Sequence, residues 1–194
     1  MPVKQTIPYN YGIYSITFTC YNWLQLIDIV NGYDIVYRWF DHLKQQGHYI
    51  TGYVIMPNHV HVIIGFKKTY QDINTIIGNG KRFMAYVIIN RLKEQGETGL
   101  LDKLTNGVEA SRKANNKKHE VWELSFDWKQ CLTLDFIIQK LDYFHRNPCK
   151  GKWELCVNAV DYIHSSAKYY ITGRQGIYPV TNCADLPEID LNIE

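Results

Sequence analysis

Two histidines separated by one residue are the part of the sequence best suited to chemistry. His59 and His61 lie in the segment HVHVIIGF, residues 59–66. Because strand side chains alternate between two faces, both histidines project from one face, and the apolar residues 60, 62, 64 and 66 project from the other. Residues two apart on a strand are roughly 6–7 Å apart at the backbone, so the imidazoles can converge on one metal ion. The alternative is a pair of strand histidines that binds no ligand.

The segments around this pair predict an α+β protein. Alternating or apolar runs predict strands at 11–20, at 119–124 and twice within 48–66, where Pro57-Asn58 forms a turn. Helical spacing of apolar residues predicts helices at 33–46, 70–95 and 134–146, with a weak point at Gly78 and Gly80. This order predicts a ferredoxin-like split βαβ sandwich: an antiparallel sheet with helices on one face, plus a C-terminal helix.

Length and composition predict a single globular domain over residues 1–170 and an acidic, loose C-terminal tail over 171–194. The chain has 194 residues, 46% hydrophobic and 21% charged, with a formal net charge of +2. The polar residues 102–118 predict a mobile loop or an extended hairpin tip. Because acidic residues gather in the tail, the body is more basic than the whole chain, which mildly favours a polyanionic partner.

The cysteines and the apolar runs predict a cytoplasmic protein without membrane association. Five cysteines form no CxxC pair, which fits free thiols in a reducing compartment. No apolar run approaches the length needed to span a bilayer, and the first residues lack the apolar stretch of a secretory signal.

Two blocks of the sequence resemble a known family. The segment Tyr53-Val-Ile-Met-Pro-Asn-His-Val-His-Val-Ile-Ile64 resembles the signature of the single-tyrosine HUH transposases, in which two histidines flank one hydrophobic residue on a central strand. A second block, residues 140–148 followed by 161–169, resembles the C-terminal region of the REP-associated tyrosine transposase branch. Residues 77–83 match more loosely. The resemblance covers roughly residues 11–170, with the blocks in the expected order.

This resemblance implies a metal-assisted reaction on single-stranded DNA at hairpin-associated sites. In the family a divalent metal, Mn²⁺ or Mg²⁺, polarises a DNA phosphate, and a tyrosine attacks it to form a 5′-phosphotyrosine and a free 3′ hydroxyl. The covalent bond conserves energy, so the strand can be rejoined elsewhere. The expected partner is single-stranded or hairpin DNA, and the expected protein is a monomer or a homodimer.

Two positions in the sequence could correspond to the family's nucleophile. The resemblance implies a tyrosine shortly after Trp122 and a polar metal ligand one helical turn later, where the sequence has Phe126 and Gln130. Gln130 could complete the metal shell with His59 and His61, but phenylalanine cannot attack a phosphate. Tyr143 is a second candidate for the catalytic residue, because Asn147 follows it by four residues on a predicted helix. Its motif accompanies the nucleophile in family members, which favours a structural role. His145 is a further candidate contact to metal or phosphate.

Basic residues near these motifs are candidates for contacts to the DNA backbone. They are Lys67, Lys68, Lys81, Arg82, Arg112, Lys113, Lys150 and Lys152, with Lys117 and Lys118 close by in the polar segment. Together they predict an affinity that falls with salt and depends little on sequence. Trp153 and the tyrosines are candidates for stacking on unpaired bases, with core packing as the alternative.

The sequence is also compatible with three other functions. A relative without nuclease activity would only bind DNA hairpins, and Phe126 favours that reading. A ferredoxin-like RNA-binding module is disfavoured because the strands show no RNP-like aromatic signature. A metal hydrolase acting on small phosphoesters is disfavoured because no acidic cluster for two metals is visible.

Overall fold

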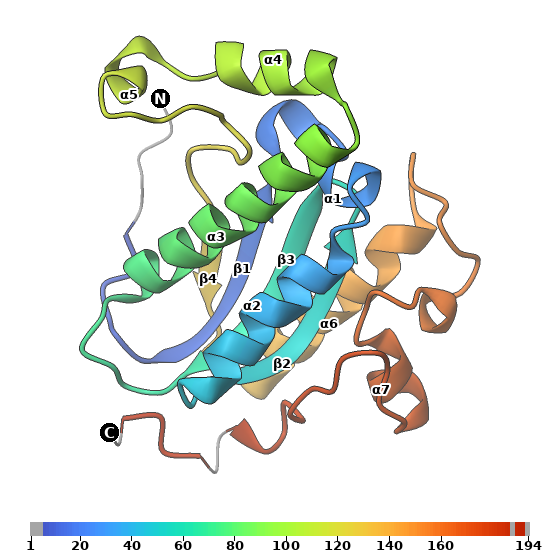
Figure 1. The fold of residues 1–194 in the computed structure, drawn as a ribbon. Coiled ribbons are helices and arrows are strands. Elements are labelled where there is room, and N and C mark those ends of the chain that lie inside the picture. The colour runs from blue at the N-terminus through green and yellow to red at the C-terminus, as the bar shows by residue number, and fades with distance from the viewer. Residues whose placement is uncertain (1–5, 187–188, 193–194) are drawn as a thin grey trace.

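The computed structural model describes residues 6–186 and 189–192. Its sheet has four strands and is packed between helices (Figure 1). The elements are β1 (Gly12–Thr19), the short turn η1 (Tyr21–Trp23), α1 (Leu26–Ile29), α2 (Tyr33–Gln45), β2 (Tyr49–Met56), β3 (His59–Phe66), α3 (Ile73–Glu94), α4 (Thr98–Asn106), α5 (Ala110–Lys113), β4 (Asp127–Gln130), α6 (Leu134–Arg146), η2 (Asn147–Cys149), η3 (Ala159–Asp161) and α7 (Ala167–Thr172). None of the helices in the described ranges has the length and apolar character needed to cross a membrane.

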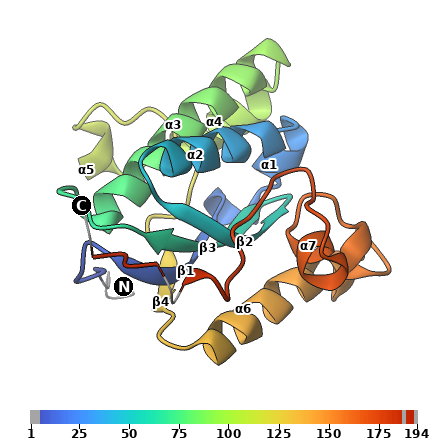
Figure 2. The same cartoon turned by 90° about the horizontal axis from the view of Figure 1, so that it is seen from below.

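The sheet has the order β2-β3-β1-β4, and every neighbouring pair is antiparallel. This is the predicted ferredoxin-like arrangement. Helices α2 and α3 cover one face, as predicted, and the C-terminal helix α6 crosses the other (Figure 2). The sheet is therefore the middle of three layers, and α6 is the element that can meet the histidine face.

The face under α2 and α3 holds the main core. Alternate residues of β3, from Val60 to Phe66, are fully buried there, together with Tyr14, Ile16 and Phe18 of β1. The predicted weak point of α3 is not a break, because the helix is continuous across Gly78 and Gly80. A Cβ at Gly80 would lie 2.3 Å from the Trp39 ring nitrogen, so this glycine allows α2 and α3 to approach closely.

The fourth strand of the sheet is formed by other residues than those predicted. Residues 119–124 pair with the sheet only through an isolated bridge between Cys20 and Trp122, and Trp122 is held by a 2.8 Å hydrogen bond from its indole N–H to the Lys81 carbonyl. The strand proper, β4, begins at Asp127 and has only four residues. The predicted loop at 102–118 is instead largely helical, since α4 buries Leu104 and α5 follows it.

The C-terminal residues pack on the body, so the expectation of a loose tail does not match the structure of the described residues. Tyr178, Val180 and Leu186 are buried, and the Thr181 N–H donates to the Ile50 carbonyl at 2.9 Å. An earlier segment also covers the edge of β2, where the Ile55 N–H donates to the His164 carbonyl at 2.9 Å. These contacts satisfy backbone groups that an exposed edge strand would leave unpaired.

On the face of the sheet opposite α2 and α3, helix α6 packs very close to strand β2. Leu141 of α6 packs over Gly52, where an added Cβ would lie 2.1 Å from a Leu141 methyl carbon. A second, smaller apolar cluster forms here, with Val54, Ile63 and Phe144 among its buried members.

Candidate active site

The histidine pair lies at the start of β3, under the C-terminal half of α6. The ring centroids of His59 and His61 are 4.7 Å apart and their planes are nearly perpendicular, at 86°. Both side chains are buried, with 5% and 6% exposure. The prediction that both histidines share one face is confirmed by this contact between their rings, and Thr17 on β1, opposite His61, bonds to His61 on the same face.

A hydrogen-bond network fixes the protonation of His59. Asn58 donates from its amide nitrogen to the Trp23 carbonyl at 2.9 Å, so its amide oxygen faces His59 and accepts from Nδ1 at 2.6 Å. The His59 proton is therefore on Nδ1, and Nε2 keeps its lone pair. A histidine whose second nitrogen is held in this way is typical of a metal ligand.

His61 is held at both of its ring nitrogens. Nδ1 is 2.6 Å from the Thr17 hydroxyl, and Nε2 is 2.8 Å from the amide nitrogen of Asn147. Donation by this amide leaves the His61 proton on Nδ1, which donates to Thr17. The ring also stacks on Phe144, with centroids 4.8 Å apart and planes 17° apart.

Burial keeps both imidazoles neutral. It lowers the pKa of His59 to about 4, with a further contribution from the nearby Lys152 ammonium. It lowers the pKa of His61 well below its usual value, assisted by His59 and Lys140. Neutral imidazole is the form that binds a metal ion.

The amide of Asn147, beside His61, is a third candidate metal ligand. The described residues contain no group of three or more His, Cys, Asp or Glu side chains able to hold a metal, so a third protein ligand there would have to be an amide or a hydroxyl. Two ligands at right angles, each about 2.1 Å from a metal ion, lie about 3.0 Å apart. The Asn147 amide is 2.8 Å from Nε2 of His61, and turning this amide over would present its oxygen. The residues present thus fit a divalent ion.

Tyr143 of α6 lies beside His61, next to the candidate metal ligands. It precedes Asn147 by one helical turn, its ring centroid is 5.6 Å from that of His61, and its side chain is 57% exposed. It lines an opening of about 590 Å³ together with Thr17, Asp127 and Lys140. An exposed tyrosine therefore lies beside two neutral imidazoles and an amide, and tyrosine is a side chain that can act as a nucleophile.

The predicted arrangement of Phe126 and Gln130 on one helical face does not match the structure. Phe126 and Gln130 lie on an extended segment and not on a helix, and Gln130 pairs with Tyr14, whose side chain faces α2 and α3. Gln130 is therefore on the face away from the histidines and cannot complete their shell. Phe126 packs against the main core and also lines the opening beside Tyr143.

The predicted basic residues do not all lie in one place. Lys152 lies beside His59, and Lys150 is exposed nearby on the same loop. Lys67 and Lys68 follow the far end of β3, roughly 20 Å from His61 at the strand's rise per residue. The ammonium of Lys81 is buried and donates to the carbonyls of Glu123 and Ser125, so Lys81 holds the segment before β4.

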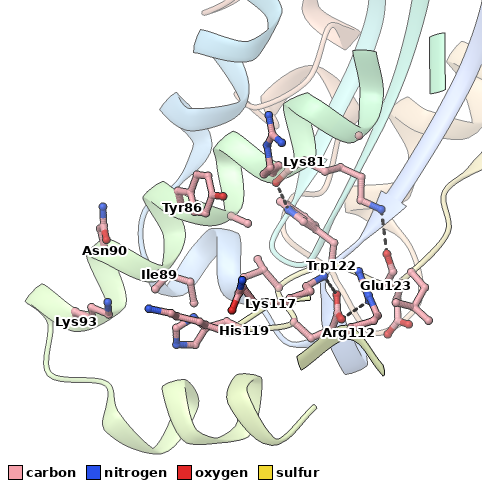
Figure 3. Close-up of a pocket in the computed structure, with 18 residues that line it drawn as sticks. Lys81, Tyr86, Ile89, Asn90, Lys93, Arg112, Lys117, His119, Trp122 and Glu123 are labelled. Carbon is pink, nitrogen blue, oxygen red and sulfur yellow. Dashed lines mark hydrogen bonds and ion pairs between the residues drawn. The ribbon is translucent and has the colours of Figure 1, made fainter. Parts of the chain in front are cut away.

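The remaining cations border a groove of about 700 Å³ between α3 and residues 112–124 (Figure 3). Arg112 and Lys117 form ion pairs with the buried Glu120 and so build its wall. Exposed Arg82, Lys93 and Lys118 line it as well, whereas Lys113 is exposed outside it. Burial, then Lys93 and Lys118, lower the pKa of His119, which reflects positive charge in the groove.

This groove and the opening beside Tyr143 share the lining residues Gly78, Lys81 and Leu124. The two hollows therefore adjoin at the edge of the sheet formed by β4.

Three polar residues near the histidines were not predicted as site residues from the sequence: Thr17, Asn58 and Lys140. Strand alternation could have indicated Thr17, since residues 15, 17 and 19 share the histidine face. His145, predicted as a possible ligand, is buried and instead bonds through Nε2 to the Ser166 hydroxyl at 2.9 Å.

The fold of the chain is similar to that of a transposase of known structure. The chain matches the solved structure of a REP-associated tyrosine transposase bound to a REP hairpin, with a TM-score of 0.62 and 16% sequence identity over 94% of this chain and 93% of that one. A Deinococcus radiodurans R1 protein assigned as a transposase matches with a TM-score of 0.40 and 16% identity, over 73% of this chain and 95% of that one. No protein-family model and no curated protein matches the sequence.

Proposed function

We propose that this protein cleaves single-stranded DNA at hairpin-associated sites and rejoins it through a phosphotyrosine intermediate. The observation that carries the proposal is the arrangement of Tyr143 and Asn147 on one face of α6 against the histidine pair. The likeness to a hairpin-bound transposase in fold supports the choice of DNA hairpins as the partner.

In the proposed reaction, His59, His61 and the Asn147 oxygen would hold a divalent cation, with Mn²⁺ better suited than Mg²⁺ to imidazole ligands. Such an ion supplies neutralisation of negative charge on a phosphate oxygen. The Tyr143 oxygen attacks phosphorus as its proton leaves, and a phosphorus–oxygen bond to tyrosine forms. The bond to the 3′ oxygen breaks, and that oxygen takes up a proton as a free hydroxyl. A 3′ hydroxyl later attacks the phosphotyrosine and releases Tyr143, so no ATP is needed.

Cations around the site would hold the strand. Lys140 and Lys152 lie near the histidines, and the groove lined by Arg82, Lys93 and Lys118 continues from the opening beside Tyr143. Because these contacts are to phosphate, affinity is expected to fall steeply with salt. Hairpins with single-stranded flanks are expected to bind more tightly than plain duplex.

The RNA-binding alternative is disfavoured by α6. A ferredoxin-like module that stacks bases on its sheet needs the face opposite its two helices to be open. Here α6 crosses that face and buries Ile63 and Val54 (Figure 2).

The test is covalent capture of DNA. Purified protein is mixed with Mn²⁺ and a hairpin oligonucleotide with single-stranded flanks, labelled at either end, and run on a denaturing gel. A 3′-end label is expected to migrate with the protein, because the 5′ phosphate of the downstream fragment is the one bound. A 5′-end label is expected only on a free fragment.

The matched variants are Tyr143→Phe and Tyr9→Phe, since both tyrosines are exposed, at 57% and 55%, and Tyr9 lies before β1, whose other end pairs with His59. Tyr143→Phe is expected to abolish the adduct, and Tyr9→Phe to retain it. An adduct that persists in Tyr143→Phe would refute the assignment of the nucleophile. Hairpin binding without any adduct in the unmodified protein would favour the alternative of a DNA-binding relative without nuclease activity.

A further inference from the structure

Two tryptophans flank His59 without being needed for the chemistry described above. The ring centroids of Trp23 and Trp153 are 6.1 Å and 6.0 Å from that of His59. Trp23 is 59% exposed, although a large aromatic side chain gains most from burial. Trp153 is half-buried. We refer to Trp23 and Trp153 as the indole pair.

The backbone at Trp23 is held in a strained conformation. Asn22 and Trp23 have φ values of +50° and +56°, in the left-handed region that bulky residues rarely adopt. Hydrogen bonds maintain this turn: the Asn22 N–H donates to the Glu123 carboxylate at 2.8 Å, and Asn58 donates to the Trp23 carbonyl at 2.9 Å. Such strain persists where the surroundings over-determine it, and it gathers at ligand sites.

Asn58 couples this turn to the candidate metal ligand. Its amide nitrogen holds Trp23 while its oxygen holds Nδ1 of His59. One side chain thus positions both an imidazole for the metal and an exposed indole beside it.

Trp153 is presented by a similarly constrained loop. Gly151 and Glu154 on either side of it have φ values of +63° and +41°. The base of the loop is closed by the Leu155 N–H donating to the Pro148 carbonyl at 2.8 Å, and the sulfur atoms of Cys149 and Cys156 are 3.0 Å apart.

The ammonium group of Lys152 lies close to both indole rings. The Lys152 ammonium is 6.0 Å from the Trp23 centroid and 5.2 Å from the Trp153 centroid. Indole faces attract cations and also stack on nucleic-acid bases of any sequence. A lysine between indoles therefore offers charge for a phosphate and apolar faces for its neighbouring base.

We propose that the indole pair and Lys152 bind the unpaired nucleotide next to the cleaved phosphate, with a base stacked on indole and a backbone phosphate on the ammonium. This inference rests on the proposed function, because it takes the scissile phosphate to lie at the histidine pair. It adds a base-stacking site that is tolerant of sequence and fixed in position relative to His59.

The test measures the affinity for a hairpin oligonucleotide with single-stranded flanks by fluorescence anisotropy, in a Tyr143→Phe background that prevents cleavage. Trp23→Ala and Trp153→Ala are each expected to raise Kd by about 5- to 150-fold, the range for loss of one stacked base. Trp23→Phe, which retains an aromatic face, is expected to lose less. Tyr9→Ala is the control, because Tyr9 is 55% exposed but lies before β1, whereas Trp23 follows that strand.

Position is tested by photocrosslinking. Oligonucleotides carrying 5-bromodeoxyuridine at one position at a time are irradiated with the protein and the crosslinked peptides are mapped. A crosslink to peptides containing Trp23 or Trp153 is expected only from the nucleotide adjoining the cleaved bond. Unchanged Kd in both alanine variants, with crosslinks elsewhere, would overturn the indole site while leaving adduct formation by the unmodified protein intact. If the unmodified protein neither binds nor captures DNA, the proposed function itself fails.

Discussion

The sheet face under α2 and α3 is lined by aliphatic and aromatic side chains, whereas the face under α6 combines a smaller apolar cluster with bonded polar groups. On the first face, residues such as Ile16, Phe18 and Val62 are fully buried without polar neighbours on the strands. On the second, His59 and His61 are nearly as buried and Thr17 is partly exposed, and all three take part in specific hydrogen bonds. One face stabilises the fold, and the other gives up part of its apolar packing to hold imidazoles in one orientation.

The largest effect that separates the two faces is expected from a core truncation. Phe40 of α2 is fully buried in the main core, so Phe40→Ala is expected to lower the free energy of unfolding by about 3–5 kcal/mol. Tyr143→Phe, at an exposed position beside the histidines, is expected to change it by less than about 0.5 kcal/mol. Urea denaturation of both variants measures the difference. Equal losses would mean that the α6 face carries as much of the stability as the core face.

Acid is expected to destabilise the protein through its buried histidines. Burial lowers the pKa of His59 and His145 on the α6 face, and of His48 beside Phe66, to about 4, below the usual 6.5. The unfolded chain therefore binds protons first. In the absence of added metal, stability is complete above about pH 6.5 and falls towards pH 4, by up to about 1.4 kcal/mol per pH unit for each such histidine. Urea midpoints measured across this range give the slope, and a flat profile would show that these imidazoles take up protons equally in the folded and unfolded states.

Removing proposed ligands is expected to affect metal affinity without unfolding the protein. His59→Ala and His61→Ala are each expected to abolish Mn²⁺ binding, measured by electron paramagnetic resonance of the free ion, whereas His42→Ala, at an exposed position on α2, leaves it unchanged. Asn147→Ala is expected to weaken binding by about 10- to 100-fold. Asn147→Asp retains an oxygen ligand and is expected to bind at least as tightly as the unmodified protein. Full affinity in Asn147→Ala would exclude this amide from the shell.

The smallest effect is expected from single charges of the groove on the α3 side. Arg82→Gln, Lys93→Gln and Lys118→Gln are each expected to reduce the slope of log affinity against log salt by about 0.7–0.9. Lys168→Gln serves as a control, since this exposed lysine lies on α7, away from the groove. The slopes come from anisotropy titrations at several salt concentrations. If the three variants keep the slope of the unmodified protein, DNA does not follow this groove.

Sequence periodicity located most of the fold because the long elements bury one continuous stripe each. Helix α6 was predicted at its observed ends, and the strands of the histidine hairpin followed from alternation interrupted at Pro57. Strand β4 could not be predicted in this way. It has four residues, two of them charged, and it pairs with β1 alone, so nothing in its own pattern distinguishes it from a loop.

In the candidate site, too, local features could be predicted and long-range contacts could not. His59 and His61 could be predicted because their relation is set by one strand. The contact of Asn147 with His61 joins residues 86 positions apart and depends on where α6 crosses the sheet, which no local pattern specifies. The packing of the C-terminal tail could not be predicted for the same reason. The buried Tyr178 donates a hydrogen bond to Asp41 of α2, a partner 137 positions away in the sequence.

The close approach of Leu141 to Gly52 has a consequence for how the sequence can vary. Tyr143 and Asn147 are on the same helix as Leu141, so the room left by a hydrogen atom at position 52 sets how near they come to the histidines. A methyl group at 52 would press on Leu141 and lift the helix unless residue 141 became smaller. Among close relatives, the two positions are expected to change together, as a compensating pair that keeps the gap between helix and sheet constant.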